Sequence, residues 1–160
     1  MYFFEQNLLR FPQAKTPPGS FGTALHVTLK NLHSFQRREG GLPSQELLDR
    51  WFTESLRAER MSAADERNYL SKGIRALRTY VDARKDAIST SDEVEVSFKH
   101  EGVVIEGARL AGNIDKIVQS PDGLVVVDYK TGKAVCEWAG GDAREKLKIQ
   151  KYSRQLLFYK

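Results

Sequence analysis

The chain has 160 residues, enough for one domain with a sizeable core, and 41% of them are hydrophobic and 29% charged, as is usual in globular proteins. Its formal net charge of +4 is compatible with a polyanionic partner but does not identify one. A single cysteine, Cys136, excludes a disulfide framework or a cysteine-based zinc site within one chain. No apolar run approaches the about 20 residues that cross a bilayer, and the N-terminus lacks the segments of a signal peptide, so we expect a cytoplasmic protein.

The first half of the sequence predicts helices. Residues 15–20 contain two consecutive prolines and predict a loop. Ser20 or Thr23 is placed to cap the first helix, because the apolar residues that follow have helical spacing. Ser44 and Ser62 are placed to cap two more helices, the last of which carries many basic residues. The basic residues of this last helix predict a solvated surface. The alternative is that they form a strip that faces DNA.

The second half predicts strands followed by a helix. Residues 93–99 alternate between apolar and polar side chains, as in a half-buried strand, and two glycines beyond them predict a bend or bulge. The clearest element is a hairpin, in which the apolar runs 114–118 and 124–127 flank a Ser-Pro-Asp-Gly turn. A last helix is expected to start near Asp142.

Two acids and a lysine accompany this hairpin. Asp115 lies on its first strand and Asp128 at the end of its second, and Lys130, two residues later, points to the same face if the strand continues. Carboxylate oxygens suit a hard cation such as Mg²⁺ or Mn²⁺, and a lysine can orient water or stabilise charge on a phosphate. The alternatives are that Asp115 is a loop acid or an ion-pair partner, and that Asp128 and Lys130 form a plain structural ion pair.

Four short motifs occur in order along the chain. They are GTALH at 22–26, GNIDKI at 112–117, DYKTG at 128–132 and QLLFY at 155–159. Together they resemble the GxxxH, GxIDRI, DYKTG and QxxxY motifs of PD-(D/E)XK nucleases, in particular the RecB-like nuclease domain of bacterial helicase–nucleases. Lys116 stands where that family usually has arginine. The Pro121-Asp122 pair only imitates the "PD" of the name, because it lies in the predicted turn.

The resemblance implies a restriction-endonuclease-like core of the α/β or α+β class, with helices around a central mixed sheet that contains an antiparallel meander. It implies one domain over residues 1–160, excised from a larger helicase–nuclease. The Mg²⁺ or Mn²⁺ ion would be held by His26, Asp115 and Asp128. Catalysis is expected from Asp115, Asp128 and Lys130, and substrate contact from Lys116, Gln155 and Tyr159.

Outside the resemblance, these residues have simpler explanations. His26 could be an ordinary residue of an amphipathic helix, and Gln155 and Tyr159, four apart on one helical face, could serve packing alone. His33 and His100 match no motif and are predicted at the surface. Two glutamates on the strand beside the hairpin, Glu93 and Glu95, are weaker candidates for reaching the metal.

The function that these patterns favour is a metal-dependent deoxyribonuclease, acting on single-stranded or duplex DNA ends and fed by a helicase motor. The first alternative is an inactive nuclease-like domain that binds DNA or serves as a scaffold. The intact motifs argue against that alternative. A metal-binding fold with another phosphoester substrate is a third possibility.

Overall fold

A computed structural model describes residues 15–132 and 142–159. The fold divides into two compact units, one comprising Met1–Leu29 and Ser44–Arg84 and the other Lys30–Pro43 and Lys85–Lys160. Helix α1 (Pro17–Glu39) contributes residues to both. Cys136 lies outside the described residues. That the chain forms one domain stays a prediction.

Helix α1 begins earlier than the sequence suggested, so the predicted loop is wrong from Pro17 onwards. Thr16 precedes the helix, and its hydroxyl accepts a hydrogen bond from the Gly19 N–H at 3.3 Å. The two prolines occupy the first helical positions, where a missing N–H costs nothing because those N–H groups have no helical partner. Ser20 and Thr23 therefore lie inside the helix and do not cap it.

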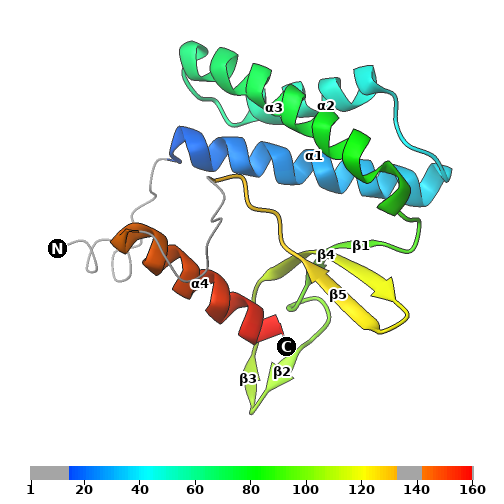
Figure 1. Cartoon of the computed structure of the whole chain (residues 1–160), viewed down its shortest axis with the longest axis vertical. Helices are drawn as coiled ribbons and strands as arrows, with labels where there is room; N and C mark the ends of the chain where they lie inside the picture. Colours follow the sequence, from blue (N-terminus) through cyan, green and yellow to red (C-terminus); the bar gives the residue numbers. More distant parts are fainter. Residues whose placement is uncertain (1–14, 133–141, 160) are drawn as a thin grey trace. The chain divides into compact units, whose positions relative to one another are not determined.

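Two further helices complete the first unit (Figure 1), α2 (Gln45–Ala58) and α3 (Ala63–Arg84). The Ser44 hydroxyl accepts from the Leu47 N–H at 3.2 Å, and the Ser62 hydroxyl accepts from the Asp65 N–H at 3.1 Å. Both predicted caps are confirmed. After α3 the chain makes one turn of 3-10 helix over Lys85–Ala87.

The core of the first unit is built around Phe52, whose side chain is fully buried. The ring of Phe21 lies 6.2 Å from it, edge to face, and 4.9 Å from the ring of Tyr69. Gly73 on α3 lets the Phe52 ring approach the helix backbone, because a Cβ atom built there would lie 2.0 Å from the ring. The fit of a ring against a bare backbone thus joins α2 to α3.

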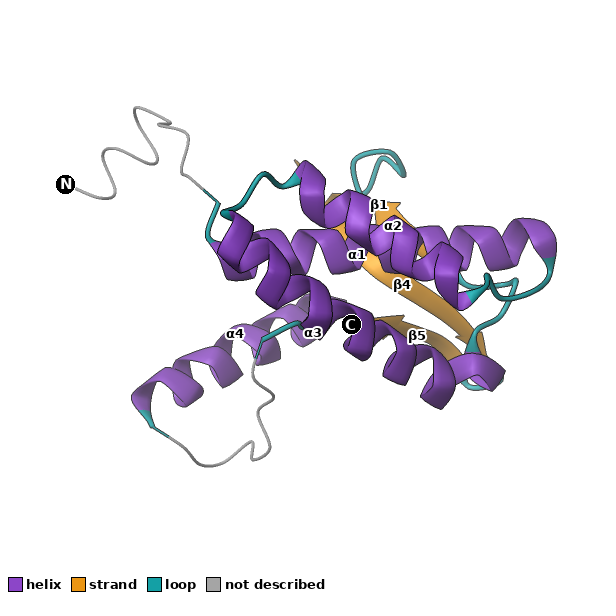
Figure 2. Ribbon diagram, turned by 90° about the horizontal axis from the view of Figure 1, so that it is seen from above, coloured by secondary structure: helices purple, strands orange, loops and turns teal. Residues whose placement is uncertain are grey.

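The second unit contains an antiparallel sheet of three strands in the order β1–β4–β5. Its strands are β1 (Glu93–Ser97), β4 (Asn113–Ser120) and β5 (Gly123–Val127), drawn in orange in Figure 2. The β4–β5 hairpin and its turn are confirmed, since Ser120 pairs with Gly123. With its helices, the chain has the predicted α+β, restriction-endonuclease-like class, and the described strand pairs are all antiparallel.

Between β1 and β4 the structure has a small separate hairpin in place of the expected bend. Strands β2 (Val104–Ile105) and β3 (Ala108–Arg109) pair across Glu106 and Gly107. Both of these residues have positive φ, 49° and 82°, which is the geometry of a tight two-residue hairpin turn.

The side chains of strand β4 alternate between the two faces of the sheet. Ile114 and Lys116 are buried on one face, whereas Asp115 between them points to the other and is half-buried. Lys116 is the partner of Val127 in the β4–β5 register. Asp128, the next residue along the chain, lies just beyond this last described pair of β5. That Asp115 and Asp128 meet at one metal site stays a prediction.

Helix α4 (Ala143–Tyr159) ends the described chain. It begins where predicted, and a carboxylate oxygen of Asp142 accepts hydrogen bonds from the backbone N–H groups of Arg144 at 2.8 Å and Glu145 at 2.9 Å. Within residues 15–132 and 142–159, no helix has both the length and the apolar character needed to span a membrane.

Candidate active site

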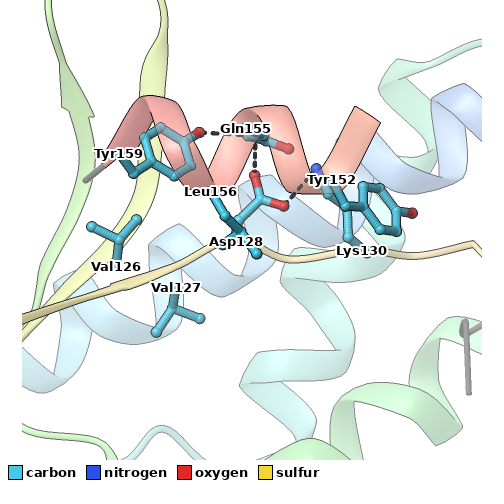
Figure 3. A pocket seen from close by; sticks show the side chains of 8 residues that line it. All are labelled: Val126, Val127, Asp128, Lys130, Tyr152, Gln155, Leu156 and Tyr159. Carbon is cyan, nitrogen blue, oxygen red and sulfur yellow. Dashed lines mark hydrogen bonds and ion pairs between the residues drawn. The ribbon is translucent and has the colours of Figure 1, made fainter. Parts of the chain in front are cut away.

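Asp128 joins the DYKTG segment to helix α4. One of its carboxylate oxygens lies 2.5 Å from the ammonium of Lys130, and the other accepts a hydrogen bond of 2.8 Å from the Gln155 side chain (Figure 3). The same amide nitrogen of Gln155 lies 2.8 Å from the Tyr159 hydroxyl. Four predicted site residues are thus brought together. Because β5 ends at Val127, Lys130 is aligned with Asp128 by their ion pair and not by the alternation of a strand.

A pocket of about 350 Å³ opens beside this group. Apolar side chains, among them Val126 and Leu156, form much of its wall, and Asp128 and Lys130 supply charge. The Lys130 ammonium lies 5.4 Å from the centre of the Tyr152 ring, at cation–π distance. A positive charge and an acid at the edge of an apolar pocket form a suitable place to hold and polarise a phosphate ester.

A second pair of acids lies on neighbouring strands. Glu95 on β1 stands opposite Asp115 on β4, between two paired positions of the ladder. Carboxylate oxygens of the two residues lie within 4.8 Å of each other. Glu95 has a positive φ of 52°, which is uncommon for a residue with a side chain and marks local strain. Of the two glutamates considered from sequence, Glu95 is the one that joins a predicted site residue.

Neighbouring groups fix the orientation of both carboxylates. The Asn113 side chain donates to Glu95 at 3.1 Å, and the backbone N–H of Tyr129 donates to Asp115 at 2.7 Å. Two close carboxylates that share no proton repel each other unless a cation lies between them. Their oxygens are also the ligands that Mg²⁺ and Mn²⁺ prefer, so the residues present fit such an ion.

His26 lies on the part of α1 that belongs to the first unit, and its side chain is half-buried. Its role as a metal ligand stays a prediction.

Lys116 and His33 are placed differently from expectation. Lys116, predicted to contact substrate, is only 5% exposed, and its ammonium lies 2.5 Å from Asp92. Its contact with substrate stays a prediction. His33 is 1% exposed, so its predicted surface position is wrong, whereas His100 is exposed as expected. Leu32 beside it is also fully buried, so the two residues belong to the buried side of α1.

Asp92, which none of the sequence patterns above singles out, is fully buried. One signal could have found it. Alternation along β4 places Lys116 on the same face as Ile114, and a lysine on a buried face needs an acidic partner.

Comparison with known proteins gives one finding. The family model described as the PD-(D/E)XK nuclease superfamily matches residues 1–160. Searches of curated proteins and of solved structures found no match. The match extends over the whole sequence. The chain belongs to the PD-(D/E)XK nuclease superfamily.

Proposed function

We propose that this domain is a deoxyribonuclease that hydrolyses phosphodiester bonds with Mg²⁺ or Mn²⁺. The observation that carries the proposal is the contact between Lys130 and Asp128, which both line the pocket. A lysine that is 42% exposed on its side chain and is oriented by an acid can meet a substrate phosphate.

Glu95 and Asp115 would hold the ion, with Asp128 and His26 as the further ligands. When bound, such an ion polarises the scissile phosphate and lowers the pKa of a coordinated water. The other tasks belong to the protein. Lys130 orients the attacking water or balances the charge that builds up on the phosphate oxygens.

Gln155 and Tyr159 would shape the substrate side of the site. The Gln155 amide holds one oxygen of Asp128, which leaves the other for Lys130. Tyr159 bonds the same amide and lines the pocket, where its ring can meet a sugar or base of the substrate. The family usually acts on nucleic acid, and the net charge of +4 favours a polyanion. We further propose a cytoplasmic helicase–nuclease as the parent protein, with a motor that delivers single strands or duplex ends.

Digestion of end-labelled single-stranded and duplex DNA with Mg²⁺, Mn²⁺ or a chelator tests the proposal. We expect cleavage with either metal, none with chelator, and none by Asp128→Ala, which loses a carboxylate of the site. DNA binding without cleavage under all of these conditions would favour an inactive nuclease-like scaffold.

A further inference from the structure

A cluster of polar side chains is buried behind the candidate active site. It consists of His33, Asp92, Lys116 and the hydroxyl of Tyr129, and we call it the buried polar cluster. The side chains of His33 and Asp92 are completely buried and that of Lys116 is 6% exposed. Removing such groups from water is costly unless they bond one another. The contacts among these groups offset part of this cost.

Asp92 is the centre of the cluster. One of its carboxylate oxygens lies 2.5 Å from the Lys116 ammonium and 3.3 Å from Nδ1 of His33. The same oxygen accepts a hydrogen bond of 3.1 Å from the Ser89 backbone N–H. The charge of Lys116 thus balances the negative charge of Asp92, and the backbone N–H of Ser89 also holds the carboxylate.

The chemistry of these groups determines the direction of the next hydrogen bond. Burial, and then the charge of Lys116, lower the pKa of His33 to about 4 against the opposing effect of Asp92. The imidazole is therefore neutral near pH 7 and carries one N–H. A carboxylate only accepts, so the proton belongs on Nδ1, facing Asp92. Nε2, which lies 3.1 Å from the Tyr129 hydroxyl, is then the acceptor.

Tyr129 links the cluster to the site. It lies between Asp128 and Lys130, two positions beyond the last paired residue of β5, Val127. Its hydroxyl bonds His33, and its backbone N–H bonds Asp115 at 2.7 Å. Residue 129 is thus tied to the buried face of the sheet by its side chain and to the site face by its backbone.

We propose that His33, held by Asp92 and Lys116, is a positioning residue that fixes the segment carrying Asp128 and Lys130 through the Tyr129 hydroxyl. This inference rests on the proposed nuclease function. Apolar side chains in place of the cluster could fill the same space without desolvating charges, but they could not bond that hydroxyl. Because a misplacement of about 1 Å can cost about 10²-fold in rate, a tether at this point affects the chemistry directly.

Tyr129→Phe is the sharpest test, because it deletes one hydroxyl and keeps the ring. We expect hydrogen exchange at the Tyr129 amide, followed by NMR in the metal-free protein, to accelerate by about tenfold or more. We expect kcat to fall by about 10- to 100-fold, with KM changed by less than about threefold, because the defect lies in alignment and not in DNA binding. Tyr69→Phe deletes a tyrosine hydroxyl in the first unit and should change neither quantity.

His33→Gln and His33→Leu supply a second pair. Glutamine can place an acceptor near the position of Nε2, so it should keep most of the amide protection and kcat, whereas leucine should lose both. If leucine prevents folding, the Tyr129→Phe result decides. Unchanged amide exchange in folded Tyr129→Phe would overturn the inference. If the chain without any substitution cleaves no DNA, the proposed function fails. The exchange measurement still decides whether the buried polar cluster holds this segment.

Discussion

The Lys130 ammonium lies 2.5 Å from one carboxylate oxygen of Asp128, and the Gln155 amide holds the other oxygen at 2.8 Å. This relationship gives the acid two neighbours and places the lysine in the lining of the pocket. Lys130 and Asp128 either take part in catalysis or form an ion pair that only supports the structure. Substitution of Lys130 distinguishes these two roles.

Lys130→Ala is expected to slow DNA cleavage by about 10²–10³-fold, the effect of removing one oriented charge from the reacting centre. DNA affinity, measured by fluorescence anisotropy, should change little because many other contacts hold the substrate. Lys130→Arg should not restore cleavage, since the guanidinium is planar and larger.

Lys72→Ala is the matched control. Its ammonium lies 5.4 Å from the Tyr69 ring in the first unit, the same distance as that of Lys130 from Tyr152. The rate of DNA cleavage by this variant should stay within about twofold of the rate of the chain without substitutions. If Lys130→Ala behaves like Lys72→Ala, the lysine only forms an ion pair.

Asp115→Asn and Glu95→Gln should each weaken Mn²⁺ binding by more than about tenfold in calorimetry, because each removes a charged ligand while keeping its shape. Asp122→Asn is the control for charge. Asp122 belongs to the exposed turn between β4 and β5, so its substitution should leave metal binding and cleavage as in the parent. Equal loss in all three variants would mean that net charge, and not a site, attracts the ion.

Gly73→Ala should destabilise the protein by about 1–3 kcal/mol despite the better helix propensity of alanine. The new Cβ would lie 2.0 Å from the buried Phe52 ring, which must move. Urea unfolding measures the loss, and Phe52→Leu in the same chain should recover part of it by shortening the side chain. Gly41→Ala, which would meet nothing within 4 Å, should be neutral. A neutral Gly73→Ala would contradict the packing of α2 on α3.

Stability should fall as the pH drops from 6.5 towards 4, because of His33. Its pKa is about 4 in the folded protein against 6.5 ordinarily, so below pH 6.5 the unfolded chain binds a proton that the folded chain does not. The contribution is complete above pH 6.5, and up to about 3 kcal/mol is lost by pH 4.

Urea unfolding at several pH values measures this loss. His33→Gln carries no titrating imidazole at this position and should show a flatter pH dependence between pH 6.5 and 5. Parallel curves for the two proteins would show that other groups control the acid sensitivity.

The sequence by itself determined the order of elements and the family. Helical spacing, serine caps and the Ser-Pro-Asp-Gly turn are local signals, and the structure confirms α2, α3, α4 and the β4–β5 hairpin that they predicted. Local signals fail at the start of α1, where two consecutive prolines predict a loop although the first turn of a helix tolerates them. The family motifs also named Asp128, Lys130, Gln155 and Tyr159, which the structure joins.

Only the tertiary structure decided which residues lie behind and beside these motifs. His33, Asp92 and Lys116 are far apart in the sequence and carry no shared spacing, so their burial together depends on which helix turn covers which face of the sheet. Glu95 likewise joins Asp115 through the register of β1 on β4 and through a strained backbone angle. Charges brought together from distant segments leave no local pattern, because the desolvation that makes their pairing necessary arises only when the chain is folded.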